Sequence, residues 1–251
     1  MKITRKELLR LGGAALLAGG AGAAVRALDA GAGPAPTATD AIRWGMVVDT
    51  RACAAQTECR ECSRACNATH NVPQIPVESQ QVKWISKEPQ ARVFPFQVAA
   101  AGEAAAASVP VLCNHCASPP CVPVCPTQAT WKRADGIVMM DYHRCIGCRY
   151  CMAACPYGAR SFNFVSPRPY LAQTSPDYPT RTQGVVEKCN FCAERLAAGR
   201  QPACVEACPV KALEFGNLND ASSSVRRALR ARPAVQRRPE LGTAPAVFYL
   251  L

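Results

Sequence analysis

The stretch Cys145-Ile146-Gly147-Cys148-Arg149-Tyr150-Cys151-Met152-Ala153-Ala154-Cys155-Pro156 contains four cysteines spaced C-x2-C-x2-C-x3-C, followed by a proline. This spacing is typical of [4Fe-4S] ligands. Two-residue gaps allow three thiolates to surround one cubane, and Gly147 lets the backbone approach an inorganic sulfide. The three-residue gap places the fourth cysteine one helical turn further on, so that it binds a different cluster. A structural zinc site needs two pairs of ligands instead, so the run predicts redox metal.

The chain has sixteen cysteines, which fall into four groups of four with none left over. The groups are Cys53, Cys59, Cys62 and Cys66; Cys113, Cys116, Cys121 and Cys125; Cys145, Cys148, Cys151 and Cys155; and Cys189, Cys192, Cys204 and Cys208. Sixteen cysteines in 251 residues lie below the density of small disulfide scaffolds. The complete grouping therefore predicts four metal sites rather than scattered thiols.

The formal net charge of +11 raises the question of nucleic-acid binding. Residues 1–30 hold five basic and two acidic side chains, a balance of +3, so the remainder carries +8. Each oxidised cubane with four thiolates brings about −2, and four of them bring about −8. The excess of Lys and Arg is therefore interpreted as compensation for cluster charge, and no nucleic-acid partner is expected.

Residues 1–30 have the form of an export signal. Thr4–Arg10 is basic, and the Gly/Ala-rich run Leu11–Val25 is too short to span a bilayer. The segment resembles a twin-arginine signal with Lys6 in place of the second arginine. That route exports folded proteins, which suits a cofactor assembled in the cytoplasm. The alternative is an amphipathic helix that is not cleaved.

The export interpretation divides the chain into a signal at 1–30, a flexible Gly/Ala/Pro/Thr linker at 31–41 and a folded domain at 42–251. No later run approaches the ~18 apolar residues of a membrane span. After cleavage, membrane attachment would therefore require a partner.

The second and third cysteine groups flank residues 129–141, in which Asp135-Gly136 separates two short apolar runs. This pattern predicts a β-hairpin. Motif, hairpin and motif together form the plan of a two-cluster ferredoxin, and we place this inner unit at about 109–165. In such a unit the fourth cysteine of each run binds the other cluster. One cluster is thus expected on Cys113, Cys116, Cys121 and Cys155, and its neighbour on Cys145, Cys148, Cys151 and Cys125.

The first and fourth groups are expected to form a second such unit, from 42–97 and 185–220, wrapped outside the inner one. The same exchange assigns one cluster to Cys53, Cys59, Cys62 and Cys208, and the other to Cys189, Cys192, Cys204 and Cys66. The first group is the least regular, because five residues separate Cys53 from Cys59 and Asn67 stands where the other groups have proline. The expected fold class is α+β: two nested ferredoxin-like units with short strands, short helices and long loops.

Weaker patterns complete the expected layout. Strands are predicted at 42–49, 82–85, 159–164 and 212–215, and a helical turn at 194–199 closed by Gly199. Residues 98–108 predict a surface loop or a short frayed helix, and the proline-rich 166–180 an ordered loop or a docking arm. In the tail at 221–251, a helix capped at Ser222–Ser224 should end at Arg232 before Pro233, and 239–251 should pack back in extended form.

Three histidines, His70, His115 and His143, lie near the cysteines. Because every predicted site already has four thiolates, we interpret them as neighbours of the ligands or as structural residues. No Ser–His–Asp set, P-loop or dinucleotide fingerprint appears in the sequence. No catalytic residue is therefore assigned.

Four ferredoxin motifs in this arrangement resemble the four-cluster electron-transfer subunits of membrane-associated respiratory complexes, over the chain from about Trp44 onward. Four stretches are similar to the exported iron–sulfur subunit of the dissimilatory sulfite reductase-linked transmembrane complex. They are 43–49 (RWGMVVD), 113–133 (CNHCASPPCVPVCPTQATWKR), 135–160 (DGIVMMDYHRCIGCRYCMAACPYGAR) and 239–250 (PELGTAPAVFYL). Lys6 and the wide first motif depart from the family pattern.

The resemblance implies a periplasmic, non-catalytic subunit that passes single electrons along four [4Fe-4S] clusters, held at the membrane by partners. The implied partners are a polytopic quinone-interacting membrane subunit, a multihaem cytochrome c, and a membrane cytochrome b with a cytoplasmic iron–sulfur subunit. The alternative is the ferredoxin subunit of an exported molybdopterin oxidoreductase, of the polysulfide or tetrathionate type, or of a hydrogenase. A zinc or disulfide structural protein is the alternative from another class, and it predicts a colourless protein.

Overall fold

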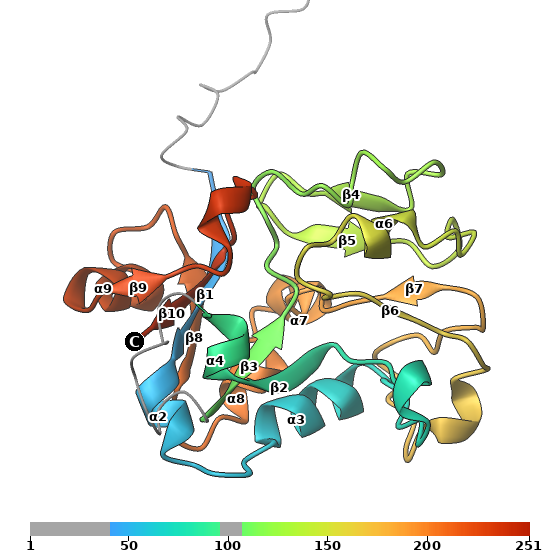
Figure 1. The fold of residues 1–251 in the computed structure, drawn as a ribbon, viewed down its shortest axis with the longest axis horizontal. Coiled ribbons are helices and arrows are strands. Elements are labelled where there is room, and N and C mark those ends of the chain that lie inside the picture. The colour runs from blue at the N-terminus through green and yellow to red at the C-terminus, as the bar shows by residue number, and fades with distance from the viewer. Residues whose placement is uncertain (1–40, 96–106) are drawn as a thin grey trace, which may run out of the picture. The chain divides into compact units, whose positions relative to one another are not determined.

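The largest sheet joins the two ends of the folded domain. In a computed structural model, which describes residues 41–95 and 107–251, β1 (Trp44–Asp49) pairs antiparallel with β8 (Leu213–Asn217) and parallel with β10 (Val247–Leu250). The short β9 (Ala234–Val235) completes the order β8-β1-β10-β9 (Figure 1). Met46, Val47 and Val48 in β1 are all buried, as expected for a central strand covered on both faces.

Three two-stranded antiparallel sheets make up the rest of the β-structure in the described ranges. They are β2 (Ile85–Pro89) with β3 (Ser108–Leu112), β4 (Thr130–Lys132) with β5 (Val138–Met140), and β6 (Ser161–Phe162) with β7 (Val186–Glu187). The β4–β5 pair is the predicted hairpin, and Gly136 in its turn has a φ of +85°. Sheets this small are not stable alone, so they depend on what they pack against.

The helices are short, and five of the seven in the described ranges contain or directly follow a cysteine. They are α2 (Thr50–Ala54), α3 (Glu61–Thr69), α4 (Gln90–Val93), α6 (Tyr150–Ala153), α7 (Ala193–Ala197), α8 (Ala203–Glu206) and α9 (Ser224–Ala231). Single 3-10 turns lie at η1 (Glu78–Gln80), η2 (Arg168–Tyr170) and η3 (Pro239–Leu241). α6 and α8 each end just before a Cys-Pro pair, 155–156 and 208–209. Proline cannot continue the helix in the usual way, so the motif itself limits helix length.

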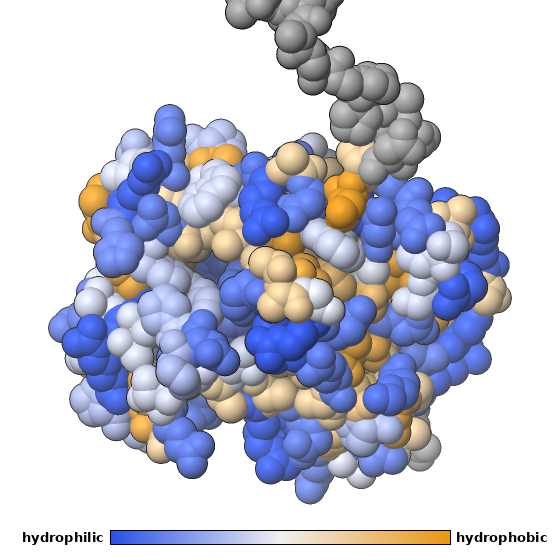
Figure 2. Space-filling view, turned by 180° about the vertical axis from the view of Figure 1, so that it is seen from behind, coloured by the Kyte–Doolittle hydropathy of each residue, from blue (hydrophilic) through white to orange (hydrophobic). Residues whose placement is uncertain are grey.

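A single large apolar core joins segments from both ends of the folded domain. Trp84 and Tyr249 are 1% and 0% exposed, and the ring of Phe94 packs against Tyr249 at 4.9 Å between centroids. The Tyr249 hydroxyl donates to the carbonyl of Pro110 at 3.1 Å. The predicted extended tail is therefore confirmed as β10 and belongs to the core. On the rear face of the molecule, hydrophobic residues lie in separate patches among hydrophilic ones (Figure 2).

Most of the predicted elements are present. The strands at 42–49 and 212–215 correspond to β1 and β8, and the helix after Ser222–Ser224 is α9, whose N-cap Ser223 accepts from the N–H of Arg226. The proline-rich 166–180 contains a 3-10 turn but no strand or α-helix. The small mixed α/β structure with short elements agrees with the predicted class, while the nesting of two units stays a prediction.

Two predicted strands differ from the structure in their bounds. The strand expected at 82–85 begins only at Ile85 and runs to Pro89, because Val82 and Trp84 are buried in the core before pairing starts. The strand expected at 159–164 is reduced to Ser161–Phe162, since its partner β7 is only two residues long. In 82–85 hydrophobicity marked burial rather than hydrogen-bonded pairing, whereas in 159–164 the buried side chains are the polar Arg160 and Asn163, and Phe164 is exposed.

The predicted signal at 1–30 and the linker up to residue 40 lie outside the described residues, as does most of 98–108. Within the described part of the chain, no helix has both the length and the apolar character needed to cross a membrane.

Candidate metal centres

The third cysteine group lines a small cavity beside β5 and β7. Four cysteines line this cavity: Cys125, Cys145, Cys148 and Cys151, hereafter the Cys125 set. Gly147 has a φ of +71° and Arg149 one of +63°, so the loop turns back on itself before α6 begins. The N–H of Val186 lies 3.5 Å from the Cys145 sulfur. Cys148 is exposed, whereas the other fifteen cysteines are buried or half-buried.

Three cysteines of the second group line a separate cavity, whose wall includes Val138 of β5. Its cysteines are Cys113, Cys116, Cys121 and Cys155, hereafter the Cys113 set. Burial raises the pKa of Cys116, and nearby thiols raise it further, to about 12. His115, inside this motif, is fully buried, and its Nδ1 accepts from the N–H of Val138 at 3.0 Å. Its ring stacks on Phe191 at 3.7 Å between centroids, so His115 joins the two halves of the chain.

A third cavity brings together cysteines that lie far apart in the sequence. It is lined by Cys53, Cys59, Cys62 and Cys208, hereafter the Cys53 set. Two donors point at these sulfurs: Lys87 Nζ lies 2.9 Å from Cys53 Sγ, and the N–H of Ala212 lies 3.2 Å from Cys208 Sγ. The wide first motif thus still brings Cys53 and Cys59 to the same cavity as Cys62.

The remaining four cysteines are all buried and adjoin one another. They are Cys66, Cys189, Cys192 and Cys204, hereafter the Cys66 set. Burial raises the pKa of Cys66 well above its usual value, and the charges of Cys189, Cys204 and Cys192 raise it further. Backbone N–H groups of Phe191 and Ala203 lie 3.4 Å from the sulfurs of Cys189 and Cys192.

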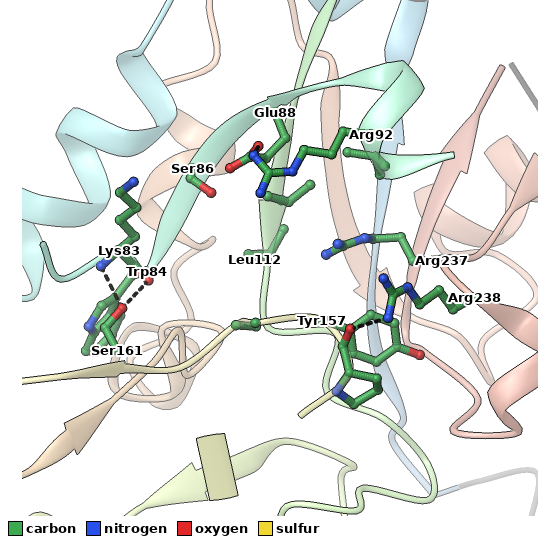
Figure 3. A pocket seen from close by; sticks show the side chains of 15 residues that line it. Lys83, Trp84, Ser86, Glu88, Arg92, Leu112, Tyr157, Ser161, Arg237 and Arg238 are labelled. Atoms are coloured by element: carbon green, nitrogen blue, oxygen red, sulfur yellow. Dashed lines mark hydrogen bonds and ion pairs between the residues drawn. The ribbon is translucent and has the colours of Figure 1, made fainter. Parts of the chain in front are cut away.

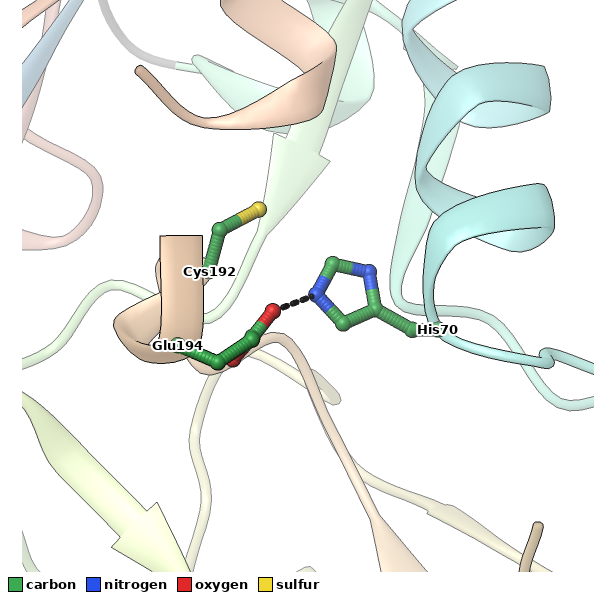
Figure 4. Close-up of side chains that lie close together, drawn as sticks. All are labelled: His70, Cys192 and Glu194. Atoms are coloured by element: carbon green, nitrogen blue, oxygen red, sulfur yellow. Dashed lines mark hydrogen bonds and ion pairs between the residues drawn. The ribbon is translucent and has the colours of Figure 1, made fainter. Parts of the chain in front are cut away.

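His70 and Glu194 lie beside Cys192 of the Cys66 set, as Figure 4 shows. The donor atoms of His70, Cys192 and Glu194 lie within 4.8 Å of one another, close enough to hold a single metal ion. His70 Nε2 is 2.7 Å from the Glu194 carboxylate, and its Nδ1 is 3.7 Å from Cys66 Sγ. Burial lowers the pKa of His70, but Cys192 and Glu194 raise it to about 9. His70 Nδ1 also lies 3.0 Å from the carbonyl oxygen of Cys66, so both ring nitrogens have partners, and the interpretation of His70 as a neighbour of the ligands stays a prediction.

The sixteen side chains fit [4Fe-4S] clusters chemically. All are free thiols, and each of the four sets offers four sulfurs. Burial and neighbouring thiols raise the pKa of seven of these thiols, for example Cys62 and Cys121, so these seven need a cation to ionise. Thiolate donors with N–H···S contacts are what iron–sulfur clusters require. Each set combines three cysteines of one run with the last of another, as the exchange rule predicts; their assignment as ligands stays a prediction.

The four sets adjoin one another in a row. Burial raises the pKa of three thiols, two in the Cys66 set and one in the Cys125 set, and for each of them a thiol of a neighbouring set raises it further. The pairs, affected thiol first, are Cys204 with Cys62, Cys189 with Cys113, and Cys151 with Cys121. The order along the row is therefore Cys53 set, Cys66 set, Cys113 set and Cys125 set.

Several buried charged residues near the sulfurs were not singled out by the sequence analysis. Lys188 is 1% exposed, Arg160 is 5% exposed, and Arg181 is paired with Glu187 in the interior. A sequence signal existed for two of them, because Lys188 directly precedes Cys189 and Arg160 follows Cys155 by five residues. Charged residues inside otherwise buried cysteine motifs are expected to have a counter-charge.

A larger polar groove contains no cysteine. It measures about 430 Å³ and lies between the β2–α4 segment, residues 156–161 and Arg237-Arg238. Figure 3 shows Arg92, Arg237 and Arg238 around this space, opposite Lys83 and Ser161. Its lining offers hydrogen-bond donors and one carboxylate, Glu88, which pairs with Arg92 at 3.2 Å. It therefore lacks the donor set of a metal centre.

Several known proteins similar to this chain are iron–sulfur subunits of oxidoreductases. The family model described as a 4Fe-4S dicluster domain matches residues 104–218. The chain is 44% identical to the Hdr-like menaquinol oxidoreductase iron-sulfur subunit 1 of Archaeoglobus fulgidus, with 82% of each chain covered. It is 38% identical to the menaquinone reductase iron-sulfur cluster-binding subunit of Nitratidesulfovibrio vulgaris, covering 83% of this chain and 89% of that one. Identity to a tetrathionate reductase subunit of Salmonella typhimurium is 39%, with 83% and 72% covered.

Proposed function

We propose that this chain carries four [4Fe-4S] clusters and has no catalytic reaction of its own. The chain belongs to the family of iron–sulfur electron-transfer subunits of membrane-associated oxidoreductase complexes. The observation that carries the proposal is the gathering of sixteen free thiols into four sets of four. When bound, each cluster accepts and releases one electron at a time.

The protein contributes order, burial and hydrogen bonds to this transfer. Its four sets adjoin in a row, so an electron can pass from the Cys53 set to the Cys125 set in short steps. Donors such as the N–H of Ala212 and the ammonium of Lys87 point at sulfur and stabilise the more negative, reduced state. Cys148 is exposed beside Ile146 and Tyr150, which are 66% and 64% exposed. We assign electron exchange with a partner to this end of the row.

Within the family, we propose the exported iron–sulfur subunit of a dissimilatory sulfite reductase-linked transmembrane complex. The supporting observations are the four sequence stretches that resemble that subunit, and the menaquinol and menaquinone named in two relatives. In this proposal residues 1–30 direct export, and the protein lies in the periplasm. Its partners are a polytopic quinone-linked membrane subunit, a multihaem cytochrome c, and a membrane cytochrome b with its cytoplasmic iron–sulfur subunit.

The second candidate is the ferredoxin subunit of an exported molybdopterin oxidoreductase. It is favoured by the similarity to the tetrathionate reductase subunit and to an iron-sulfur subunit of a putative dimethyl sulfoxide reductase of Halobacterium salinarum, which is 38% identical. The two candidates share the same clusters and differ in partner. Affinity purification of the tagged chain from its own membranes separates them: a multihaem cytochrome and a polytopic membrane protein support the first, and a molybdopterin-containing chain supports the second.

The cluster proposal itself is tested by iron and acid-labile sulfide on anaerobically prepared protein. We expect about sixteen of each per chain, four for each cubane. About twelve would indicate loss of one cluster, with the irregular Cys53 set the first candidate. A folded, colourless protein without iron would overturn the proposal. Export is tested separately by fusing residues 1–40 to a reporter that is active only when exported, with Arg5→Ala expected to abolish the signal.

A further inference from the structure

Two buried cations in the described part of the chain have no carboxylate partner. Lys188 Nζ donates to the backbone carbonyls of Val138 and Cys189, the latter at 2.8 Å. Arg160 donates from Nη2 to the Thr130 hydroxyl at 2.9 Å, and its Nη1 lies 3.7 Å from the sulfur of Met140. These neutral acceptors satisfy hydrogen bonds without balancing either charge.

A third buried cation, Arg181, does have a carboxylate partner. Arg181 pairs with Glu187 at 2.6 Å, and neither side chain is exposed. Trp84 and Asn163 donate to the same carboxylate. A buried ammonium or guanidinium without a counter-charge costs several kcal/mol. Lys188 and Arg160 therefore require negative charge from groups other than carboxylates.

The groups that supply this charge are the thiols on either side of each cation. Burial lowers the pKa of Lys188 and the nearby charge of Arg160 lowers it further, while Cys113, Cys189 and Cys121 raise it. Lys188 thus faces the Cys66 set through Cys189 and the Cys113 set through Cys113 and Cys121. Its bond to the Val138 carbonyl fixes this place, because Val138 lines the Cys113-set cavity.

Arg160 occupies the next gap in the row. Burial lowers its pKa, but Cys121, Cys151 and Cys113 outweigh that effect and raise it. Cys121 and Cys113 belong to the Cys113 set, whose cavity Arg160 lines, and Cys151 belongs to the Cys125 set. One cation therefore lies at each of two successive gaps, and the Cys113 set has a cation on both sides.

We propose that Lys188 and Arg160 set the reduction potentials of the sites that flank them, Lys188 for the Cys66 and Cys113 sets and Arg160 for the Cys113 and Cys125 sets. This inference rests on the proposed function, because it presupposes clusters at those sets. One electron entering a site changes its net charge from about −2 to about −3. Neither side chain gains or loses a proton, and no bond forms or breaks. A fixed cation stabilises the added charge by Coulomb attraction, so its presence raises the potential.

The test is an EPR-monitored redox titration of the full, iron-loaded chain with Lys188→Met, Arg160→Met and the double variant. Each single variant should lower the potentials of two sites, and one of those, the Cys113 set, should respond to both. At each affected site we expect the equilibrium constant for reduction to fall by about tenfold or more, which corresponds to a potential lower by ~59 mV for a one-electron couple. The double variant should move three sites and leave the Cys53 set unmoved. Arg230→Met removes an exposed positive charge on α9 and should move none.

A second pair of variants separates charge from packing. Lys188→Gln keeps a donor for the two carbonyls but removes the charge, so it should lower the same two potentials as Lys188→Met. Arg160→Lys keeps the charge and should stay close to wild type. Potentials that do not move in iron-replete variants, or that move equally at all four sites, would overturn the inference while the proposed function stands. Wild-type protein without titrating iron would instead overturn the proposed function.

Discussion

Lys87 Nζ lies 2.9 Å from the sulfur of Cys53, on the face of β2 that is turned toward the Cys53 set. The same ammonium donates to the carbonyl of Ser108 at 3.3 Å, so it is held between β3 and Cys53. Lys87 lies on β2, and Cys53 follows β1, so this contact ties the most irregular cysteine motif to a strand from another part of the chain.

Replacing Lys87 with Met is expected to weaken the Cys53 site specifically. The charge-assisted N–H···S bond is lost, and such bonds stabilise both the thiolate and the reduced state of a cluster. We expect a lower potential for one of four sites and faster loss of iron, from about sixteen toward about twelve per chain. Iron analysis during anaerobic incubation with a chelator measures the second effect.

The matched control is Lys83→Met, which removes an exposed ammonium four residues earlier in the same segment. It should lose iron at the wild-type rate. Equal rates for Lys87→Met and wild type would show that the Lys87 bond does not support the site.

Gly147 and Gly158 permit a test of why the loop of the Cys125 set needs glycine. Both have positive φ, +71° and +61°, but a Cβ at Gly147 would collide with the carbonyl oxygen of Gly184, whereas one at Gly158 meets nothing within 4 Å. Gly158→Ala should lower the free energy of unfolding by about 1 kcal/mol, which is the cost of positive φ for a residue with a Cβ. Gly147→Ala should in addition displace Cys145 and Cys148 and release about four irons per chain. Similar iron content in both variants would contradict this explanation.

The comparison of these two glycines also shows what the sequence could and could not predict. The C-x2-C-x2-C spacing singled out Gly147, but the reason given was approach to an inorganic sulfide. In the structure, the close neighbour is the backbone of Gly184, 37 residues later, which no local pattern reveals. Local spacing identified which cysteines act together within each run, and the exchange rule for two-cluster units predicted that Cys208 joins Cys53, Cys59 and Cys62, which line one cavity in the structure.

Long-range charge and pairing were the parts that sequence reasoning missed. The parallel pairing of β10 with β1 joins opposite ends of the folded domain, and an apolar tail predicts only that it packs somewhere. Lys188 and Arg160 counted only toward the net charge in the sequence, although their positions in the row give them different neighbours. Composition indicated that cations balance cluster charge, whereas only the fold indicates which cation lies at which gap.

The buried Arg181–Glu187 pair should be among the most sensitive positions outside the cysteines. Glu187→Gln leaves the Arg181 guanidinium uncompensated in a fully buried position and weakens the bond from Trp84. We expect a loss of about 3–5 kcal/mol in the free energy of unfolding. The control is Glu61→Gln, which breaks an exposed pair with Arg64 and should cost about 0–1 kcal/mol. Urea unfolding of the iron-loaded proteins under anaerobic conditions compares them, and equal midpoints would contradict the expectation.

Asp49 ends β1 and caps α2, the helix that contains Cys53. Its carboxylate accepts from the N–H groups of Arg51 and Ala52 at 3.0 Å and also pairs with Arg232. Asp49→Ala removes the cap and should reduce the free energy of unfolding by about 1 kcal/mol. Asp49→Asn keeps a capping oxygen and loses only the charge, so it should cost less. If the two variants unfold at the same urea concentration, the cap contributes nothing.

The same carboxylate predicts a pH dependence of stability. Burial raises the pKa of Asp49, but the N–H of Ala52, the Arg232 guanidinium and the N–H of Arg51 together lower it below its usual value of 3.8. A group with a lowered folded-state pKa stabilises the protein above its unfolded pKa and loses that contribution as the pH falls through the folded one. The difference in urea midpoint between wild type and Asp49→Asn should therefore be complete at pH 7 and shrink below pH 3.8. Taking the difference in urea midpoint between the two proteins at each pH removes the acid sensitivity that they share. A difference that stayed constant to the lowest pH would show that the charge of Asp49 does not contribute to stability.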